Sequence, residues 1–419
     1  MSLKIYDEYK DSKIDIVGLI PKEYEIVRLK FLCDINTGDK DTVNRNPNGT
    51  YPFYVRSPII ERIDTYSYDG ESVLMAGDGV GAGKVFHYVN GKFDYHQRVY
   101  NLHNFRHVFP KFIYYYMSSL FSIEINKGSA KSTVDSVRLP MLENFQICFP
   151  NLYKQKQIAN YLDKKTAKID ETIAKNEELI QLLEEKRITL INQAVTKGLN
   201  PDVPMKDSGI EWIGEIPEHW NIMKMKFLGT ARNGLTYKPE DISDEGLLVL
   251  RSSNIQNGKL SFKDNVYINS NIDSKFIVNE NDLLICSRNG SRQLIGKSAL
   301  ITPEISGNTF GAFMMLFKSE YNAFIQYALK SKIFAYYIDS FLTSTINQLT
   351  LQNFNNMAIP ITLDLNEQRE IQSYLDTNVN KINDTIDKIY KNIKLLDEYK
   401  TSLIHHVVTG KVDVRGEEI

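Results

Sequence analysis

The sequence has few of the features that mark secreted, metal-binding or membrane proteins. Three of its 419 residues are cysteine, namely Cys33, Cys148 and Cys286. They lie far apart without paired spacing, so neither a disulfide framework nor a zinc site is expected. No apolar run approaches the roughly 20 residues that a membrane span needs, and the N-terminal MSLKIYDEYKDSK has no apolar signal core. We therefore expect a cytoplasmic protein without a membrane partner.

The chain also lacks an excess of charge of either sign. Its 50 Lys and Arg residues are balanced by 52 Asp and Glu residues, which gives a formal net charge of −2. A nucleic-acid partner would therefore have to be held by local positive charge, because composition alone does not suggest one. The length leaves room for two or three domains, each with its own core.

A long helical pattern occurs twice. Residues 155–196 match residues 368–409 without a gap, and the triplet Tyr-Leu-Asp appears in both copies, at 161–163 and 374–376. Neither copy contains proline or glycine, and apolar residues recur at heptad spacing. Each copy is thus predicted to be an amphipathic helix of about 60 Å. Neither helix can bury its apolar stripe alone, so we expect the two to pack on each other.

A second repeat opens each half of the chain. Residues 11–32 match residues 207–228, where the second copy begins DSGIEWIGEIPEHW. Short β-rich segments, a helix-like stretch and a last strand follow in both halves. The predicted order is a first domain (1–152), a first helix (153–197), a connector (198–206), a second domain (207–364), a second helix (365–412) and a tail (413–419).

This order constrains the fold class. The first helix has to carry the chain from one domain to the other, and the second has to return if the stripes are to pack. We therefore predict an α+β protein in which two α/β domains are joined by two long antiparallel coiled-coil helices with an internal pseudo-two-fold repeat. Such a chain offers equivalent surfaces to two copies of one partner. The connector is where we expect the distance between the domains to be adjustable.

In these features the chain resembles the specificity subunit of type I restriction–modification systems over essentially its whole length. The resemblance rests on the DSGIEWIGEIPEHW opening, on NEQREIQSYLD at 366–376, and on two variable domains alternating with two helices. The first opening, DSKIDIVGLIPKEY, lacks both tryptophans. The resemblance implies two target-recognition domains, each reading one half of a bipartite sequence in double-stranded DNA. It also implies that the helices space the halves and bind two methyltransferase subunits, which restriction/translocase subunits join.

The chemistry motifs favour a non-catalytic subunit. The glycine-rich segments 77–84 and 290–297 both miss the spacing of a phosphate-binding loop. They are interpreted as hairpin turns, or as loops whose backbone N–H groups and lysine approach a DNA phosphate. No two prolines are adjacent, whereas by the resemblance an amino-methyltransferase would need such a pair. We expect no catalytic residues, no metal ligands and no cofactor.

Base discrimination in DNA relies on Arg–guanine and Asn/Gln–adenine contacts, so we look for loops rich in polar and basic residues. In the first domain the candidates are Arg56, Lys84, His96, Gln97, Arg98, Lys131, Ser132 and Thr133. In the second domain they are Arg251, Asn254, Arg288, Asn289, Ser291, Arg292, Gln293, Lys297, Ser344 and Gln348. His96 could equally be a core histidine. Arg288 and Arg292 are the arginines most expected to read bases.

Two other hypotheses remain open at this point. The repeated helices could belong to a protein-interaction scaffold without DNA specificity, or the chain could be a self-sufficient nuclease or methyltransferase. The missing catalytic motifs disfavour the second of these. Salt-dependent binding to duplex DNA would separate DNA recognition from a scaffold function, because phosphate contacts release counterions.

Overall fold

The computed structural model describes residues 5–126, 136–341 and 347–414. It divides into two compact units. Unit 1 comprises residues 1–177 with 390–419, and unit 2 comprises residues 178–389. The two long helices, α3 (Leu152–Lys197) and α8 (Leu365–Val408), therefore each contribute one part to each unit. Within the described residues no helix combines the length and the apolar character that crossing a bilayer requires.

Unit 1 opens with a hairpin and a two-stranded platform. Strand β1 (Tyr9–Asp11) pairs antiparallel with β2 (Leu19–Pro21). Strand β3 (Glu25–Arg28) then pairs antiparallel with β10 (Gln146–Phe149), which closes the domain. Because the paired strands β3 and β10 flank the variable segment between them, that segment leaves and rejoins the platform at one place.

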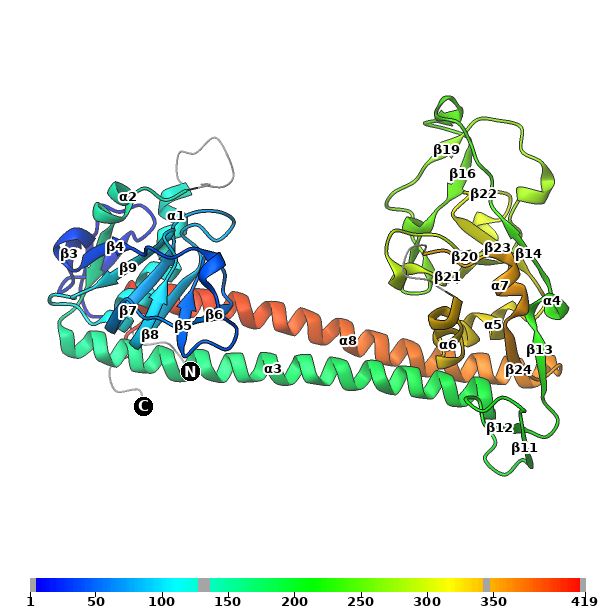
Figure 1. Cartoon of the computed structure of the whole chain (residues 1–419). Coiled ribbons are helices and arrows are strands. Elements are labelled where there is room, and N and C mark those ends of the chain that lie inside the picture. Colours follow the sequence, from blue (N-terminus) through cyan, green and yellow to red (C-terminus); the bar gives the residue numbers. More distant parts are fainter. Residues whose placement is uncertain (1–4, 127–135, 342–346, 415–419) are drawn as a thin grey trace. The chain divides into compact units, whose positions relative to one another are not determined.

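The variable segment of unit 1 is a six-stranded sheet covered by a helix. Its order is β4-β9-β7-β8-β5-β6, and all neighbours are antiparallel except β5 and β8. Helix α1 (Pro110–Asn126) packs against this sheet (Figure 1), and it buries Phe112, Tyr116, Leu120 and Phe121 in the core. The strands are β4 (Asp34–Thr37), β5 (Tyr51–Tyr54), β6 (Ile60–Ile63), β7 (Tyr68–Ala76), β8 (Phe86–Tyr95) and β9 (Val99–His103), and a short helix, α2 (Leu139–Glu143), precedes β10.

Unit 2 repeats this plan with a different insert. Hairpin β11 (Met205–Asp207) and β12 (Glu215–Pro217) precedes β13 (Asn221–Lys224), which pairs antiparallel with the closing strand β24 (Ala358–Ile361). The insert contains two four-stranded sheets, β14-β23-β20-β21 and β15-β19-β16-β22, and the hairpin β17–β18. Its strands are β14 (Thr230–Asn233), β15 (Ile242–Ser243), β16 (Leu247–Leu250), β17 (Ile255–Gln256), β18 (Lys259–Leu260), β19 (Tyr267–Ile268), β20 (Leu283–Cys286), β21 (Ser298–Leu300), β22 (Thr309–Phe310) and β23 (Met314–Lys318).

The helix-like stretch of the second half is two helices rather than one. Helices α5 (Asn322–Ala328) and α6 (Lys332–Phe341) are separated at Ser331, whose hydroxyl accepts a hydrogen bond from the Ile333 N–H at 3.2 Å. Serine before the first turn is a favoured helix cap, so the sequence starts a new helix there. The unit also contains the short helices α4 (Met225–Leu228) and α7 (Leu351–Asn356).

The two long helices pack on each other within each unit. In unit 1, Leu162 and Ile169 of α3 share the buried core with Leu403 near the end of α8. An ion pair joins Asp170 Oδ1 to Lys400 Nζ at 2.6 Å. The beginning of α3 thus meets the end of α8, so the helices run antiparallel here (Figure 1).

Unit 2 has the complementary arrangement. Ile191 and Val195, near the end of α3, are buried with Ile371 near the start of α8. The Arg187 guanidinium donates to Asn383 Oδ1 at 2.7 Å across the pair. The helices are therefore antiparallel in this unit too, and the predicted fold class is confirmed.

The repeated Tyr-Leu-Asp triplet fixes each helix to its variable domain. Leu162 and Leu375 are fully buried. Asp163 accepts a hydrogen bond from Tyr115 of α1 at 2.7 Å, and Asp376 accepts one from Tyr327 of α5. The triplet recurs because in both units its leucine is buried in the core and its aspartate accepts a hydrogen bond from a tyrosine.

The tryptophan missing from the first opening is replaced by another buried ring. In unit 2, Trp220 is fully buried and its Nε1–H donates to Glu367 Oε1 at 3.0 Å. In unit 1, the matching position holds Tyr24, which is also fully buried. Beside it Lys154 Nζ lies 2.6 Å from Glu23 Oε1, so an ion pair here links the opening to the start of α3. Both units therefore have a buried ring at this position, but the polar contact beside it is a hydrogen bond in unit 2 and an ion pair in unit 1.

The segments that follow the two helices are also alike. Gly198 follows α3 with a φ of +71° and lies against Pro217 and Trp220. Gly410 follows α8 with a φ of +72°, and a Cβ on it would collide with the ring of Pro21. These left-handed positions suit glycine and end each helix, so α8 stops at Val408, before the predicted boundary at 412.

Candidate nucleic-acid interface

In both units the same loops come together and are joined by matching backbone hydrogen bonds. We call each set of loops a loop cluster. In unit 1, the His96 N–H donates to the Tyr54 carbonyl at 3.0 Å and the Val137 N–H donates to the Gly77 carbonyl at 2.7 Å. In unit 2, the Gly311 N–H donates to Leu250 at 3.0 Å, and the Leu349 N–H donates to Ser287 at 2.7 Å. Matching backbone contacts of this kind show which residues of the two clusters correspond.

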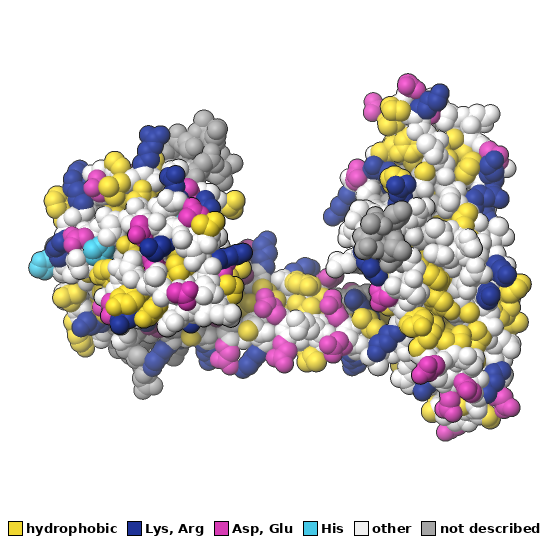
Figure 2. Space-filling view, viewed as in Figure 1, with side chains coloured by type: hydrophobic (Ala, Val, Ile, Leu, Met, Phe, Trp, Pro, Cys, Tyr) yellow, Lys and Arg dark blue, Asp and Glu magenta, His cyan; other side chains and the backbone are white. Residues whose placement is uncertain are grey.

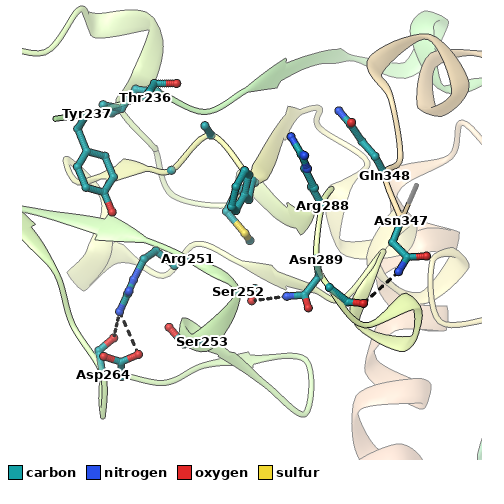
Figure 3. Close-up of a pocket in the computed structure, with 16 residues that line it drawn as sticks. Thr236, Tyr237, Arg251, Ser252, Ser253, Asp264, Arg288, Asn289, Asn347 and Gln348 are labelled. Atoms are coloured by element: carbon teal, nitrogen blue, oxygen red, sulfur yellow. Dashed lines mark hydrogen bonds and ion pairs between the residues drawn. The ribbon is translucent and has the colours of Figure 1, made fainter. Parts of the chain in front are cut away.

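The unit 2 cluster encloses an open cavity of about 1090 Å³ (Figure 3). It lies beyond the ends of β14, β16 and β20 and before the start of β23. In Figure 3, Tyr237 and Arg251 lie on one side and Arg288 and Gln348 on the other, and Phe313 also belongs to the lining. The cavity combines aromatic faces with hydrogen-bond donors and acceptors. That mixture is typical of sites that recognise a planar polar ligand such as a base.

Arg288 is held in this cavity by its backbone and by a ring. An isolated antiparallel bridge joins its backbone to that of Gln348. Its guanidinium carbon lies 5.2 Å from the centre of the Phe313 ring, a cation–π contact. Its neighbour Asn289 donates from Nδ2 to Ser252 Oγ at 3.1 Å, which ties this loop to the end of β16 (Figure 3).

The other predicted residues of the second domain are distributed more widely. Arg251 lines the cavity and is paired with Asp264 at 3.0 Å. Arg292 lies on a 3-10 helix (Arg292–Leu294) outside the lining, and its guanidinium pairs with Asp339 at 2.9 Å. Asn254 is fully buried, and it donates to the Ser261 carbonyl at 3.1 Å in a packing contact.

Three more candidates also lie away from the cavity lining, and one cannot be placed. Gln293 and Lys297 line a separate pocket of about 420 Å³, and Lys297 Nζ donates to the Ser252 carbonyl at 3.4 Å. Ser291 follows Asn289, whose side-chain oxygen accepts its N–H at 3.0 Å. Ser344 lies outside the described residues. The predicted set thus contributes Arg251, Arg288, Asn289 and Gln348 to the cavity.

The unit 1 cluster is organised around a carboxylate that the sequence reasoning missed. Asp78 follows β7, and its backbone forms an isolated antiparallel bridge with Ser136. One carboxylate oxygen lies 3.1 Å from Arg56 NH1 and the other lies 3.7 Å from Arg98 Nε. Gln97 Nε2 donates to Asp41 Oδ2 at 2.7 Å beside them. Two guanidinium groups from different loops therefore lie beside the Asp78 carboxylate.

His96 is a buried residue of this cluster. The residue is 2% exposed, and its Nδ1 accepts a hydrogen bond from the Arg98 N–H at 2.9 Å. Burial lowers the pKa of His96, and the charge of Arg56 lowers it further. The ring is thus neutral near pH 7 with its proton assigned to Nε2. It shapes the turn that carries Arg98 rather than facing the solvent.

The glycine-rich segments connect antiparallel neighbours in both units. Residues 77–85 join β7 to β8, and residues 287–297 join β20 to β21. Gly79, Gly83 and Gly296 have positive φ values, as a turn requires. Lys84 is exposed on the first of these loops, so a phosphate contact there stays a prediction. Lys131, Ser132 and Thr133 lie outside the described residues.

The residues that sequence reasoning missed carry weak signals. Phe313 is 58% exposed and lies in the turn directly before β23, where the apolar run of the sequence favours a strand. Asp78 is a single acidic residue in a glycine-rich segment, and a search for polar and basic residues passes over it. Either could have been found only by aligning the two inserts loop by loop.

The electrostatics of the surface are mixed. On the face shown in Figure 2, Lys and Arg side chains alternate with Asp and Glu on each unit, without one continuous basic field. Within the described ranges, no three His, Cys, Asp or Glu side chains gather closely enough to hold a metal ion. What both clusters offer is hydrogen bonding, charge and ring stacking.

Comparison with known proteins identifies the family. The pattern described as "Type I restriction modification DNA specificity domain" matches residues 21–183 and 217–395, well over half of the chain. The type I restriction enzyme MjaVIII specificity subunit of Methanocaldococcus jannaschii is 23% identical over 97% of this chain and 98% of its own length. The EcoKI specificity subunit of Escherichia coli K12 is 31% identical over 48% of this chain and 44% of its own length.

Solved structures share the fold. A chain from a study of complex assembly and conformational transition of the type I R-M system covers 93% of this chain, with 15% identity and a TM-score of 0.67. The HsdS subunit of Thermoanaerobacter tengcongensis covers 94%, with 14% identity and a TM-score of 0.51. The prediction of a non-catalytic specificity subunit is confirmed by the family and by the names of these relatives. The chain belongs to the family of type I restriction–modification DNA specificity subunits, and it carries two DNA-recognition domains.

Proposed function

We propose that this chain recognises a bipartite target in double-stranded DNA, with the loop cluster of each unit reading one half-site. The long helices set the distance between the half-sites and dock two methyltransferase subunits, to which restriction/translocase subunits are added. The base contacts come from Arg56, Gln97 and Arg98 in unit 1 and from Arg251, Arg288, Asn289 and Gln348 in unit 2.

One observation carries this proposal: the same loops recur with different side chains. Asp78 and Arg288 both follow the strand that leads into the cluster, and both form the isolated bridge described above. His96 corresponds to Gly311 through the matched backbone contact. A framework kept constant around exchanged polar residues is suited to reading two unrelated sequences, whereas a scaffold would need no such exchange.

Docking of two identical partners is supported by the helices themselves. Leu182 and Leu395 occupy equivalent positions of the two copies, and both are exposed, at 54% and 62%. Leu182 also lines a groove of about 510 Å³ with Tyr374 in unit 2. The same apolar side chain is thus presented at one place in each unit, where two copies of one subunit can bind alike.

The test uses the chain together with its methyltransferase subunits. Methylated bases mapped in DNA from cells that carry the assembly should define one bipartite sequence with a constant gap. The purified chain alone should bind duplex DNA with an affinity that falls steeply with salt, and it should neither methylate nor cleave DNA. Binding that is insensitive to both salt and sequence would favour the scaffold hypothesis, and methyl transfer by the chain alone would refute the division of labour.

A further inference from the structure

The two loop clusters carry an arginine on different loops. In unit 1, the Gly77 N–H donates to the carbonyl of Arg98 at 2.8 Å, and in unit 2 the Ser287 N–H donates to the carbonyl of Phe313 at 3.0 Å. Arg98 and Phe313 therefore occupy the same place, on the turn before a central strand. Asp78 and Arg288 occupy the facing place, on the loop after another central strand. The pair Asp78–Arg98 in one unit is thus replaced by Arg288–Phe313 in the other.

In both units this pair presents one supported guanidinium. In unit 2 it is that of Arg288, which lies over the Phe313 ring. The other arginines of the loop region, Arg251 and Arg292, are paired with carboxylates. Within the described residues, no carboxylate lies within ion-pair distance of Arg288. Its N–H groups are thus available to a ligand while the ring fixes the plane of the group.

In unit 1 the supported guanidinium is that of Arg98. Its Nε lies 3.7 Å from the Asp78 carboxylate, and among the described residues neither of its terminal nitrogens donates a hydrogen bond. The second carboxylate oxygen is occupied by Arg56, whose charge compensates that of Asp78. The Arg98 side chain is 65% exposed, against 46% for Arg56, so it is the more accessible of the two.

A fixed guanidinium with a free edge suits a base better than a phosphate. Phosphate contacts need only a nearby cation, which a mobile side chain supplies. A bidentate contact needs two N–H groups held in one plane, and guanine is the base that offers two acceptors, N7 and O6, on its major-groove edge. Support from a carboxylate or a ring also reduces the rotamer freedom that binding would otherwise remove.

We propose that Arg98 and Arg288 are the guanine-reading residues of the two half-sites, presented from opposite walls of the two corresponding loop clusters. Asp78 and Phe313 are their positioning residues. This inference rests on the proposed function and adds to it the identity of one base in each half-site.

The first experiment replaces the arginine that is proposed to contact guanine. Gln discriminates in favour of adenine, because its amide pairs with N6 and N7. With Arg288→Gln in the methyltransferase assembly, the mapped sites should change from guanine to adenine at one position of the second half-site. The first half-site should stay as it is, and this unchanged half reports that the chain is folded. Arg98→Gln should produce the reciprocal result.

The second experiment tests the support and does not depend on the first. Phe313→Leu should reduce the preference for guanine at the same position by roughly 5- to 150-fold, the worth of a bidentate contact. Phe313→Tyr, which keeps the ring, should preserve the preference. Arg232→Ala serves as the charge control, because Arg232 lies on β14 outside the cavity lining and donates to the Lys275 carbonyl.

The outcomes separate this inference from the proposed function. If the parent assembly methylates no bipartite sequence, the proposed function fails. If it does so but the second half-site lacks an essential guanine, or Arg288→Gln retains it, only the assignment of the reader fails. Equal weakening at every sequence would make Arg288 a phosphate contact and would overturn the inference. Should Arg288→Gln lose both half-sites, Phe313→Leu and Phe313→Tyr decide between the same alternatives.

Discussion

We predict that Lys330 destabilises the folded state of unit 2 and that replacing it raises the free energy of unfolding of this unit. It lies between α5 and α6, with its ammonium 5.1 Å from the ring centre of Tyr327 and close to Gly258. Burial lowers the pKa of Lys330 from its ordinary 10.5 to about 8, and attraction to Asp376 opposes this only in part. Arg187 and Lys259 lower it further. The folded state therefore disfavours the charged form.

The size of the effect follows from the two pKa values. At about 1.4 kcal/mol for each pH unit, the difference between 10.5 and about 8 corresponds to about 3 kcal/mol. Lys330→Met keeps the apolar stem and removes the charge, but it also removes a cation–π contact worth about 0.5–1 kcal/mol. We expect the substitution to raise the free energy of unfolding of unit 2 by about 2 kcal/mol at pH 7.

The pH dependence distinguishes this cause from better packing. Below pH 8 the lysine is protonated in both states, so the gain is constant. Between pH 8 and 10.5 the unfolded chain binds more protons than the folded one, so the parent protein becomes more stable with rising pH. The advantage of Lys330→Met should therefore shrink by about 2 kcal/mol between pH 7 and pH 9.5, by the same 1.4 kcal/mol for each pH unit.

Denaturant unfolding followed by tryptophan fluorescence measures this directly. The two tryptophans of the chain, Trp212 and Trp220, both belong to unit 2, so the signal reports that unit. Lys332→Met is the matched control, because Lys332 is exposed at the start of α6. An advantage that is the same at pH 7 and pH 9.5, or a loss of stability at both, would refute the reasoning.

Three further predictions concern the framework and the first loop cluster. Because burial lowers the pKa of His96, protonation favours the unfolded chain as pH falls below about 6.5. Discrimination between first half-site sequences should therefore weaken between pH 7 and 5.5, as measured by fluorescence anisotropy with DNA variants of that half-site. The second half-site, with Gly311 in that place, should not change, and His96→Asn should reduce the effect; equal loss at both halves would count against it. Leu375→Ala should lower the stability of unit 2 by about 2–5 kcal/mol in the fluorescence assay, whereas Leu162→Ala should leave that transition in place. One heptad inserted in each long helix, after Glu177 and after Ile389, should lengthen the gap between mapped half-sites by about three base pairs, since seven residues add about 10 Å; an unchanged gap would show that other subunits set it.

Given the proposed role of the helices in spacing the half-sites, a change in the gap is to be sought in the helices and not in the connector. Residues 198–206 lie wholly within unit 2, where Gly198 contacts the ring of Trp220. Lengthening the connector would therefore alter a loop inside one unit. The helices are the segments that the two units share, which the repeat alone did not reveal.

The framework could be predicted from the sequence because periodic patterns report local geometry. The heptad stripe and the absence of proline and glycine gave two long helices, and the gapless repeat gave their pairing. The similar letters Val55-Arg56-Ser57 and Leu250-Arg251-Ser252 suggest an alignment that the structure shifts by one residue. Strand pairing sets Tyr54 beside Tyr95 and Leu250 beside Phe310, so Arg251 takes the place of Val55.

The proposed recognition residues are harder to predict because their surroundings come from distant parts of the chain. Arg288 and Arg292 are equivalent as letters in one loop. One is supported by Phe313 and the other is paired with Asp339, and neither partner is near in sequence. A pattern of residue types cannot tell a guanidinium that is free to bind from one that is already bound.

The division of the chain into units also determines the order in which a growing chain can complete them. Unit 2 is one continuous stretch, residues 178–389, whereas unit 1 needs residues 390–419 to join residues 1–177. As synthesis proceeds, the domain made first therefore waits for the segment made last. Until Leu403 arrives, Leu162 and Ile169 have no partner helix to cover them. A nascent or truncated chain that lacks the end of α8 would leave this part of the stripe without its partner helix and expose it to aggregation and to proteases.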